Sequence, residues 1–342
     1  MMKTLKIVYN CRDDLLPAAD ILRSGGLVAF PTETVYGLGG DALDSTAAGR
    51  IYAAKGRPSD NPLIVHLASP VDAEKYCRTG EMFYRIAERF MPGPITVIMP
   101  KKDVIPDSVT GGLGTVGIRV PSHRAAHDLI DLFGGPVAAP SANISGRPSP
   151  TSFSHVVNDL DGKIDCIIDG GECFHGVEST IVMADGTGSG LKLLRPGAVT
   201  LEMLRSVCDS IEIDPAVISK YDGVPLAPGM KYRHYAPSEP LTVVDSDRES
   251  FIAFVNDRPD CGVICFDEDI SLVRSACKVS MGGSDNPEEQ ARRVFSCLRY
   301  FDSPEVRGSI NGIYARMPDE QGVGFAVFNR LIKAAGFNVL KL

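Results

Sequence analysis

The sequence has no long apolar run, no excess of positive charge and no closely spaced cysteine pair, and each absence excludes a class of protein. Its longest uncharged apolar runs, such as residues 95–100, fall far short of the roughly 20 residues that a membrane-spanning helix needs. Residues 1–6 lead into no apolar core of a signal peptide. We therefore expect a cytoplasmic protein without a membrane segment.

The charge balance argues against a protein that coats nucleic acid. Lys and Arg number 35, Asp and Glu number 43, and the net charge is −8. Bulk positive charge is therefore absent, and any anion must be bound by a local cluster of cations. The nine cysteines contain no Cys-x-x-Cys pair, which excludes a disulfide framework and a zinc knuckle and leaves reduced thiols.

Common nucleotide and hydrolase motifs are missing or misplaced. The sequence has neither Gly-x-x-x-x-Gly-Lys-[Ser/Thr] nor Gly-x-Ser-x-Gly. Residues 112–117 match Gly-x-Gly-x-x-Gly, but a dinucleotide fingerprint must follow a strand and open a helix. Here a strand should follow the glycines, so we expect a tight loop and no nicotinamide site. His175 and Glu178 have a helical ligand spacing, but the glycines around them argue against a helix and a metal site.

Length and patterning predict two α/β domains. The 342 residues suit about two domains of ~150 residues. Up to about residue 210, short β-branched runs alternate with amphipathic stretches, which is typical of an α/β fold. Residues 212–240 accumulate prolines and predict an extended linker, after which the alternation resumes. We expect strands at 5–9, 27–30, 63–67, 95–99, 115–120, 137–139, 166–168, 180–183, 191–194, 241–244, 262–265 and 312–314. We expect helices at 14–24, 45–55, 81–90, 123–133 and 153–160, from 246, from 286 and through 325–335.

Four cations stand at the ends of predicted elements, each close to proline or glycine. The run Lys55-Gly-Arg57-Pro places two of them two residues apart, where extended backbone before the proline should point both to one surface. Arg119 and Arg195 each lie near the end of a predicted strand. In a chain of negative net charge, this pattern favours a pocket for a polyanion such as a nucleoside triphosphate over four solvated side chains.

Small polar side chains repeat this arrangement. Ser141 and Asn143 have the same spacing and follow the predicted strand 137–139, near the strand end where ligands of open sheets gather. His66 lies in an apolar run and is by default a core histidine. Ordinary turns would explain further hydroxyl-rich loops, which we expect at residues 31–39, 145–151 and 176–180.

These runs resemble the Sua5/YrdC/YciO family. The resemblance rests on Pro31 to Gly39, Lys55-Gly-Arg-Pro…Asn61-Pro-Leu, Pro140-Ser-Ala-Asn…Ser-Gly, Ser179-Thr-Ile-Val, Leu194-Arg-Pro-Gly and Ala227-Pro-Gly-Met-Lys-Tyr-Arg-His-Tyr-Ala-Pro237. The last run and the C-terminal region resemble the long two-domain Sua5 form. The resemblance implies an N-terminal YrdC-like twisted open sheet with a large cleft at 1–211. It also implies a linker that crosses the active site at 212–240 and a smaller Rossmann-like Sua5 domain at 241–342.

The resemblance implies an L-threonylcarbamoyladenylate synthase. Such a nucleotidyltransferase converts L-threonine, bicarbonate and ATP, with Mg²⁺, into threonylcarbamoyl-AMP and pyrophosphate. A separate threonylcarbamoyl transferase uses the product to make N6-threonylcarbamoyladenosine at position 37 of tRNA. The implied partners are therefore these substrates, that transferase and, in a weak contact, tRNA.

The resemblance also assigns roles to individual residues. The catalytic tetrad falls on Lys55, Arg57, Ser141 and Asn143. The nucleotide should contact Arg57, Asn61, Thr115, Ser141, Ser149, Arg195, His234 and Tyr235. Threonine should be held by Thr34, His66, Arg119, the backbone of Ala139 and Ser179. No residue is assigned to a metal ion.

Two alternatives stay open. The core domain of this family also resembles a double-stranded RNA binder, but the acidic balance and the lack of a basic, aromatic strand face count against that function. The same fold handles carbamoyl adenylate within a larger hydrogenase-maturation protein. That form needs acylphosphatase-like and zinc-knuckle segments, and the cysteine spacing offers no zinc knuckle.

Overall fold

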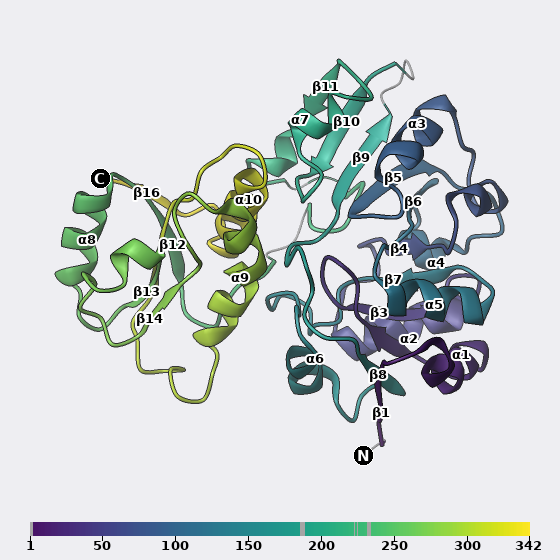
Figure 1. The fold of residues 1–342 in the computed structure, drawn as a ribbon, viewed down its shortest axis with the longest axis horizontal. Coiled ribbons are helices and arrows are strands. Elements are labelled where there is room, and N and C mark those ends of the chain that lie inside the picture. The colour runs from purple at the N-terminus through teal and green to yellow at the C-terminus, as the bar shows by residue number, and fades with distance from the viewer. Residues whose placement is uncertain (1–2, 185–188, 222, 224, 231–233) are drawn as a thin grey trace.

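The chain forms two β-sheets in a computed structural model that describes residues 3–184, 189–221, 223, 225–230 and 234–342. Strands up to Ile213 form a sheet of eleven strands, and strands from Leu241 onward form a sheet of five. We call residues 1–211 the first domain, 212–240 the linker and 241–342 the second domain. Figure 1 shows the two sheets side by side, with α9 (Pro287–Tyr300) and α10 (Gly324–Ala334) between them. The predicted mixed α/β class is confirmed.

The first sheet mixes parallel and antiparallel pairs in the order β1-β8-β2-β3-β7-β4-β6-β5-β9-β10-β11. Its centre places two predicted site residues side by side, because β4 pairs parallel with β6 and sets His66 opposite Arg119. The strands are β1 Leu5–Val8, β2 Val28–Phe30, β3 Gly37–Asp41, β4 Ile64–His66, β5 Ile95–Pro100, β6 Thr115–Arg119, β7 Val137–Ala139, β8 Cys166–Asp169, β9 Thr180–Ala184, β10 Leu191–Arg195 and β11 Ile211–Ile213.

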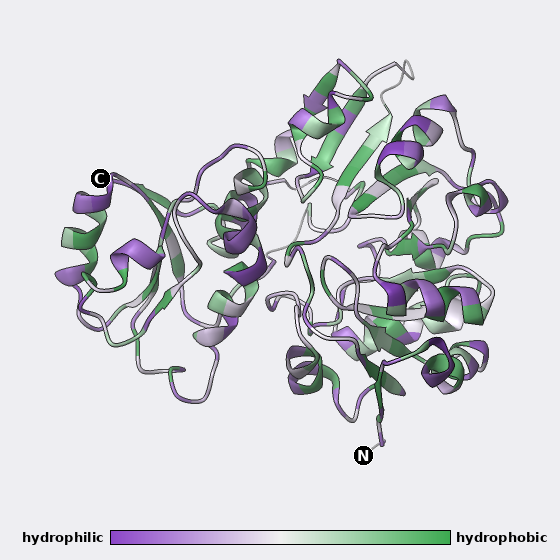
Figure 2. Cartoon of the chain, viewed as in Figure 1, coloured by the Kyte–Doolittle hydropathy of each residue, from purple (hydrophilic) through white to green (hydrophobic). Residues whose placement is uncertain are grey.

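Helices cover this sheet with apolar faces. In α3, the apolar residues recur at helical spacing and are buried: Met82, Phe83, Ile86, Ala87 and Phe90. Figure 2 shows the same alternation of green and purple on other helices, whereas the strands are largely green. The helices are α1 Leu16–Arg23, α2 Ser45–Lys55, α3 Glu81–Phe90, α4 Asp107–Thr110, α5 Arg124–Phe133, α6 Phe153–Leu160 and α7 Leu201–Leu204, with 3-10 turns η1 Arg12–Leu15, η2 Pro70–Lys75 and, in the linker, η3 Pro215–Val217.

The second sheet is parallel in each of its described pairs and has the order β14-β13-β15-β12-β16. Parallel neighbours need crossover connections, which the helices of this domain supply. This is the arrangement that the Rossmann-like expectation described. The strands are β12 Leu241–Asp245, β13 Gly262–Cys265, β14 Lys278–Ser280, β15 Ile313–Arg316 and β16 Val339–Lys341, and the remaining elements are α8 Arg248–Asn256 and η4 Asp267–Asp269.

Four strands were not predicted. The segment 31–39 was expected to be a loop throughout, which is wrong for its second half, because β3 begins at Gly37. The other three strands, β11, β14 and β16, have three residues each and lie at sheet edges. The expected tight loop before β6 is confirmed, and so is the absence of a helix at residues 175–178. Of the described helices, none is long and apolar enough to cross a membrane.

Candidate active site

A pocket forms where the first sheet, the end of α2 and the linker meet. Its empty volume is about 680 Å³, part of which is open to solvent. All four cations that were predicted to converge line this pocket. With them lie most of the other predicted site residues: His66, Ala139, Ser141, Asn143, Ser179, His234 and Tyr235.

Four predicted site residues do not line the pocket. Thr34 and Ser149 are fully buried behind it, and each reaches it through a neighbour: Thr34 contacts the Thr32 hydroxyl, and Ser149 donates to Glu178. Asn61 is buried beside Arg57, which donates to its carbonyl. Thr115 starts β6, at the far end of that strand from Arg119. The roles assigned to these four stay predictions.

The backbone between Lys55 and Arg57 is not extended, and this expectation was wrong. Lys55 is the last residue of α2, and Gly56 ends the helix in the left-handed region at φ 61° and ψ 35°. A glycine that caps a helix turns the chain sharply, because it has no side chain to clash in that conformation. Both side chains still reach one pocket, through a helix end and its capping turn.

Three of the four residues of the predicted tetrad, Lys55, Ser141 and Asn143, are joined by hydrogen bonds. This lysine is 1% exposed, and its ammonium donates to the carbonyls of Ser141 and Asn143, the latter at 2.6 Å. The Ser141 hydroxyl donates to Asn143 Oδ1 at 2.6 Å. Burial, and next the nearby charge of Arg57, lower the pKa of Lys55 well below its usual value. Lys55 therefore fixes the loop after β7 to the end of α2.

Arg57 and Arg195 present cations to the pocket from different elements. Arg57 Nη2 donates to the carbonyl of Pro62 at 3.1 Å. Arg195 donates from Nε to the Ser179 carbonyl at 3.0 Å and from Nη2 to the Ser179 hydroxyl at 3.1 Å. Burial lowers the pKa of both guanidinium groups to about 10. Both therefore remain charged at neutral pH.

Arg119 is paired with Glu33, an acidic residue that the sequence analysis did not single out. Arg119 Nη2 lies 2.7 Å from Glu33 Oε1, and both side chains are buried. Burial raises the pKa of Glu33, but the charge of Arg119 and the hydrogen bonds to the carboxylate together outweigh it, and the pKa is lowered overall. Within the described part of the chain, Arg119 Nε is buried without a hydrogen-bond partner. Part of the guanidinium is thus available to an anionic ligand.

The two histidines of the pocket are neutral at physiological pH. Burial lowers the pKa of His66 and of His234 to about 3. His66 Nδ1 lies 3.1 Å from the Ile64 carbonyl, so the ring can donate there and keep Nε2 as an acceptor. Tyr235, next to His234, adopts φ 64°, a left-handed conformation that strains a non-glycine residue. Residues 231–233 of the same run lie outside the described residues.

Glu178 is the second acidic residue that the sequence analysis missed as a site residue. It lines the pocket and is 6% exposed. Its Oε1 accepts from the Ser149 hydroxyl at 2.5 Å, and its Oε2 accepts from Arg330 Nε at 2.7 Å. Burial raises the pKa of this carboxyl, but Arg330 and Arg195 outweigh that effect and hold the pKa at about 2.

The described residues bring together no group of three or more His, Cys, Asp or Glu side chains that could hold a metal ion. Among the described residues that line the pocket, Glu178 is the one carboxylate, and a serine and an arginine already occupy its oxygens. The described side chains alone therefore do not form a metal cage here.

The chain matches known families over most of its length. Residues 20–197 match the Sua5, YciO and YrdC family model, which is described as telomere recombination. Residues 199–336 match the model of the threonylcarbamoyl-AMP synthase C-terminal domain.

Curated relatives match from end to end. The threonylcarbamoyl-AMP synthase of Pyrococcus abyssi is 48% identical, over 99% of this chain and 100% of the relative. That of Bacillus subtilis is 41% identical with the same coverage. That of Schizosaccharomyces pombe is 35% identical, over 95% of this chain and 88% of the relative.

Solved structures show the same architecture. P. abyssi Sua5 complexed with L-threonine superposes with a TM-score of 0.90 at 44% identity, over 99% of both chains. A double-alanine variant of P. abyssi Sua5 gives 0.91 at 42% identity, over 99% of this chain and 98% of that one. Escherichia coli YciO, at 23% identity, covers 58% of this chain and 96% of its own with a TM-score of 0.51, which indicates a shared fold only.

Proposed function

The chain belongs to the Sua5/YrdC/YciO family in its two-domain Sua5 form and makes L-threonylcarbamoyl-AMP, and we propose that it does so as a nucleotidyltransferase acting on L-threonine, bicarbonate and ATP. The observation that carries this proposal is the convergence of Lys55, Arg57, Arg119 and Arg195 on one pocket. A separate transferase would then use the product to modify position 37 of tRNA.

The guanidinium groups of Arg57 and Arg195 suit the phosphates of ATP. Both remain charged at neutral pH, and Arg195 is held in place by its two hydrogen bonds to Ser179. A guanidinium that is fixed before the ligand arrives stabilises charge on a phosphate without the cost of reorganising during the reaction.

Arg119 and His66 suit threonine. The free Nε of Arg119 can donate to the amino-acid carboxylate, since Glu33 occupies only the other end of the guanidinium. His66 lies opposite Arg119 in the pairing of β4 with β6. Its neutral ring can accept a hydrogen bond from the amine or the hydroxyl of threonine. The P. abyssi relative that was solved with L-threonine supports this class of ligand.

The reaction needs a short-lived carbamate next to ATP. The threonine amine adds to CO2 derived from bicarbonate and loses a proton. A carbamate oxygen then bonds to the α-phosphorus as the bond to the pyrophosphate oxygen breaks. Positioning and exclusion of water are the main contributions of the protein, since no covalent nucleophile is required. Lys55 contributes to positioning because it fixes the loop from Ser141 to Asn143, which lines the pocket.

Mg²⁺ would enter as part of the nucleotide. The pocket lacks a cage of protein ligands among the described residues, which fits an ion held mainly by phosphate oxygens and water. When bound, the ion would offset phosphate charge beside Arg57 and Arg195.

The alternative of a non-catalytic double-stranded RNA binder is not favoured. The net charge of −8 gives no bulk attraction to RNA, and the cations discussed above lie inside a pocket. Salt-sensitive RNA binding without nucleotide turnover would support that alternative.

Pyrophosphate release tests the proposed function. The full chain is incubated with ATP, Mg²⁺, bicarbonate and one amino acid at a time. We expect release with L-threonine, and loss of release when bicarbonate is removed. Release that is independent of the amino acid, or absent with all of them, would contradict the proposal.

A further inference from the structure

A buried arginine of the second domain reaches the pocket of the first. Arg330 lies in α10 and is 0% exposed. Its guanidinium donates to Glu178 Oε2 at 2.7 Å, to the Glu178 carbonyl at 3.2 Å and to the Pro196 carbonyl at 2.9 Å. A further bond goes to Asn329 Oδ1 at 2.9 Å. In Figure 1, α10 lies on the side of the second domain that faces the first.

The two segments that Arg330 holds each adjoin a pocket residue. Glu178 precedes Ser179, and Pro196 follows Arg195. Arg195 and Ser179 are themselves joined by two hydrogen bonds. One guanidinium therefore fixes the start of β9 and the end of β10 relative to each other, at the point where both meet the pocket.

Arg330 also offsets the negative charge of a carboxylate in the pocket. A pocket for a triphosphate contains the carboxylate of Glu178, which would repel the ligand if it were unpaired. Arg330 supplies the matching positive charge from the second domain. Among the described residues, further titratable groups that interact with Glu178 are Arg195, Tyr235, His234 and Lys55.

The linker is supported by the same domain. The guanidinium carbon of Arg330 lies 5.9 Å from the centre of the Tyr235 ring, and that ring packs at 5.1 Å on Phe295 of α9. Two neighbours of Arg330 on α10 bind the start of the linker: Asn329 donates to the Val217 carbonyl at 2.7 Å and Lys333 to the Ala216 carbonyl at 2.9 Å.

We propose that Arg330 is a positioning residue of the active site, which neutralises Glu178 and fixes the segments of Ser179 and Arg195 relative to each other, so that Arg195 is placed for ATP binding. The inference rests on the proposed function, and it gives the second domain a direct part in nucleotide binding. Arg330 acts through these residues and does not line the pocket itself.

The test compares Arg330→Gln with Arg299→Gln in the full chain. Arg299 is a matched control, because it also reaches from the second domain to a buried carboxylate, Asp159, at 2.8 Å, and it does not line the pocket. Asp159 keeps Arg147 as a partner in that variant. Steady-state kinetics give kcat and separate KM values for ATP and threonine, and calorimetry gives the affinity for a non-hydrolysable ATP analogue.

We expect Arg330→Gln to raise the KM for ATP and the dissociation constant of the analogue by about tenfold or more, since the buried carboxylate of Glu178 loses its ion pair with Arg330 and keeps only its weaker contacts. Arg299→Gln should change both values by less than about twofold. Adding Glu178→Gln to Arg330→Gln should restore most of the ATP affinity. The deficit of Arg330→Gln should also shrink as the pH falls, because protonation of Glu178 removes the unpaired charge.

Other outcomes overturn the inference. Unchanged ATP affinity in Arg330→Gln contradicts it, and so does an equal loss in both single variants with no rescue by Glu178→Gln and no pH dependence. If Arg330→Gln does not fold, Arg330→Lys and the double variant supply the same comparison. Wild-type protein that binds the analogue but releases no threonine-dependent pyrophosphate contradicts the proposed function and leaves this inference standing.

Discussion

At the scale of single residues, charges around the pocket are held by the protein before any ligand enters. Lys55 binds two backbone carbonyls, Arg119 pairs with Glu33, and Arg195 binds Ser179. Groups fixed in this way lose little further freedom when a ligand binds, so more of their interaction energy appears as binding. The same burial keeps His66 neutral.

Buried neutral histidine predicts a loss of stability in weak acid. The pKa of His66 is held at about 3 by burial, whereas an unfolded histidine titrates near 6.5. Between these values the unfolded state binds more protons, so unfolding becomes easier as the pH falls. We expect the free energy of unfolding, measured with urea, to fall between pH 6.5 and 5 with a slope approaching about 1.4 kcal/mol per pH unit for this residue.

The variant His66→Gln serves as the control for that slope. It keeps a neutral polar side chain in place of the ring and should reduce the slope in this window by the share of His66, while His234 and His155, whose pKa values burial also lowers, keep theirs. Glu33 and Glu178 have lowered pKa values, so their contribution to the free energy of unfolding is lost only below this pH window. An identical slope in wild type and variant would contradict the assignment to His66.

Residue types and local spacing predicted the cations of the pocket but not their partners. Lys55, Arg57, Arg119 and Arg195 stand within two residues of glycine or proline at element ends, and such local signals can be read along the chain. Glu33 lies 86 residues from Arg119 and Glu178 lies 152 residues from Arg330. Pairs of this separation are created by the fold. Arg330 was not singled out by the sequence analysis either.

At the scale of elements, the missed strand β3 shows where local propensity fails. The run Gly37-Leu-Gly39-Gly40 is unfavourable for a strand by composition, because glycine weakens strands. The fold requires it, since a Cβ on Gly39 would lie 2.7 Å from the side chains of both Phe30 and Val137. The neighbouring strands pack so closely that glycine is needed there. The edge strands β11, β14 and β16 were missed because three residues are too few to show the alternation of apolar and polar side chains that predicts a strand.

This packing predicts opposite effects for two glycine substitutions. Gly39→Ala should lower the free energy of unfolding by about 1–3 kcal/mol, since the added methyl group has no room. Gly49→Ala should raise it by about 0.5–1 kcal/mol, because Gly49 lies inside α2 with open space around it. Urea unfolding of both variants checks the pair. A stabilised Gly39→Ala would show that β3 can shift to make room.

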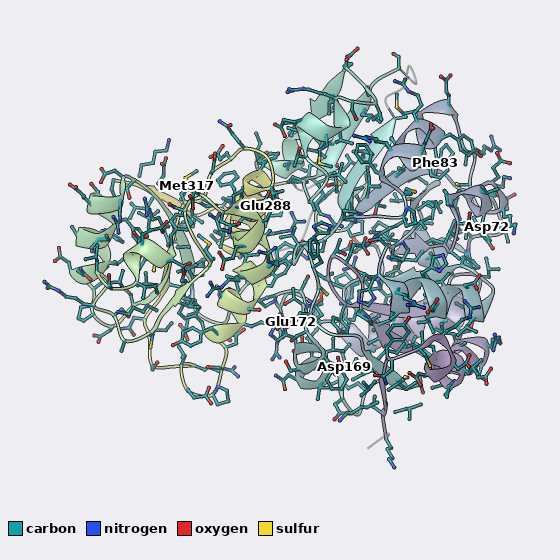
Figure 3. All side chains as sticks on the ribbon, viewed as in Figure 1. Asp72, Phe83, Asp169, Glu172, Glu288 and Met317 are labelled. Carbon is teal, nitrogen blue, oxygen red and sulfur yellow. The ribbon has the colours of Figure 1, made fainter. Side chains whose placement is uncertain are left out.

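At the scale of the whole molecule, the two domains are joined by polar and apolar contacts. The ion pairs Glu178–Arg330 and Asp159–Arg299 cross the boundary. A Cβ on Gly176 would lie 2.3 Å from Arg292 Cα, so the backbones of the two domains are in direct contact there. Figure 3 shows side chains filling this region, with Glu172 labelled on the side of the first domain and Glu288 near the start of α9. One apolar cluster contains buried residues of both domains.

Contacts of this kind predict that the domains unfold together. Separating them would expose apolar surface and leave Glu178 and Arg330 unpaired, so neither part should persist alone through the transition of the other. Differential scanning calorimetry of the full chain should show one transition. An ATP analogue with threonine, each at about 100 times its dissociation constant, should shift that transition as a unit, with about 2.7 kcal/mol of added stability per ligand. Two resolved transitions, of which only one moves with ligand, would show that the second domain is thermodynamically independent of the pocket.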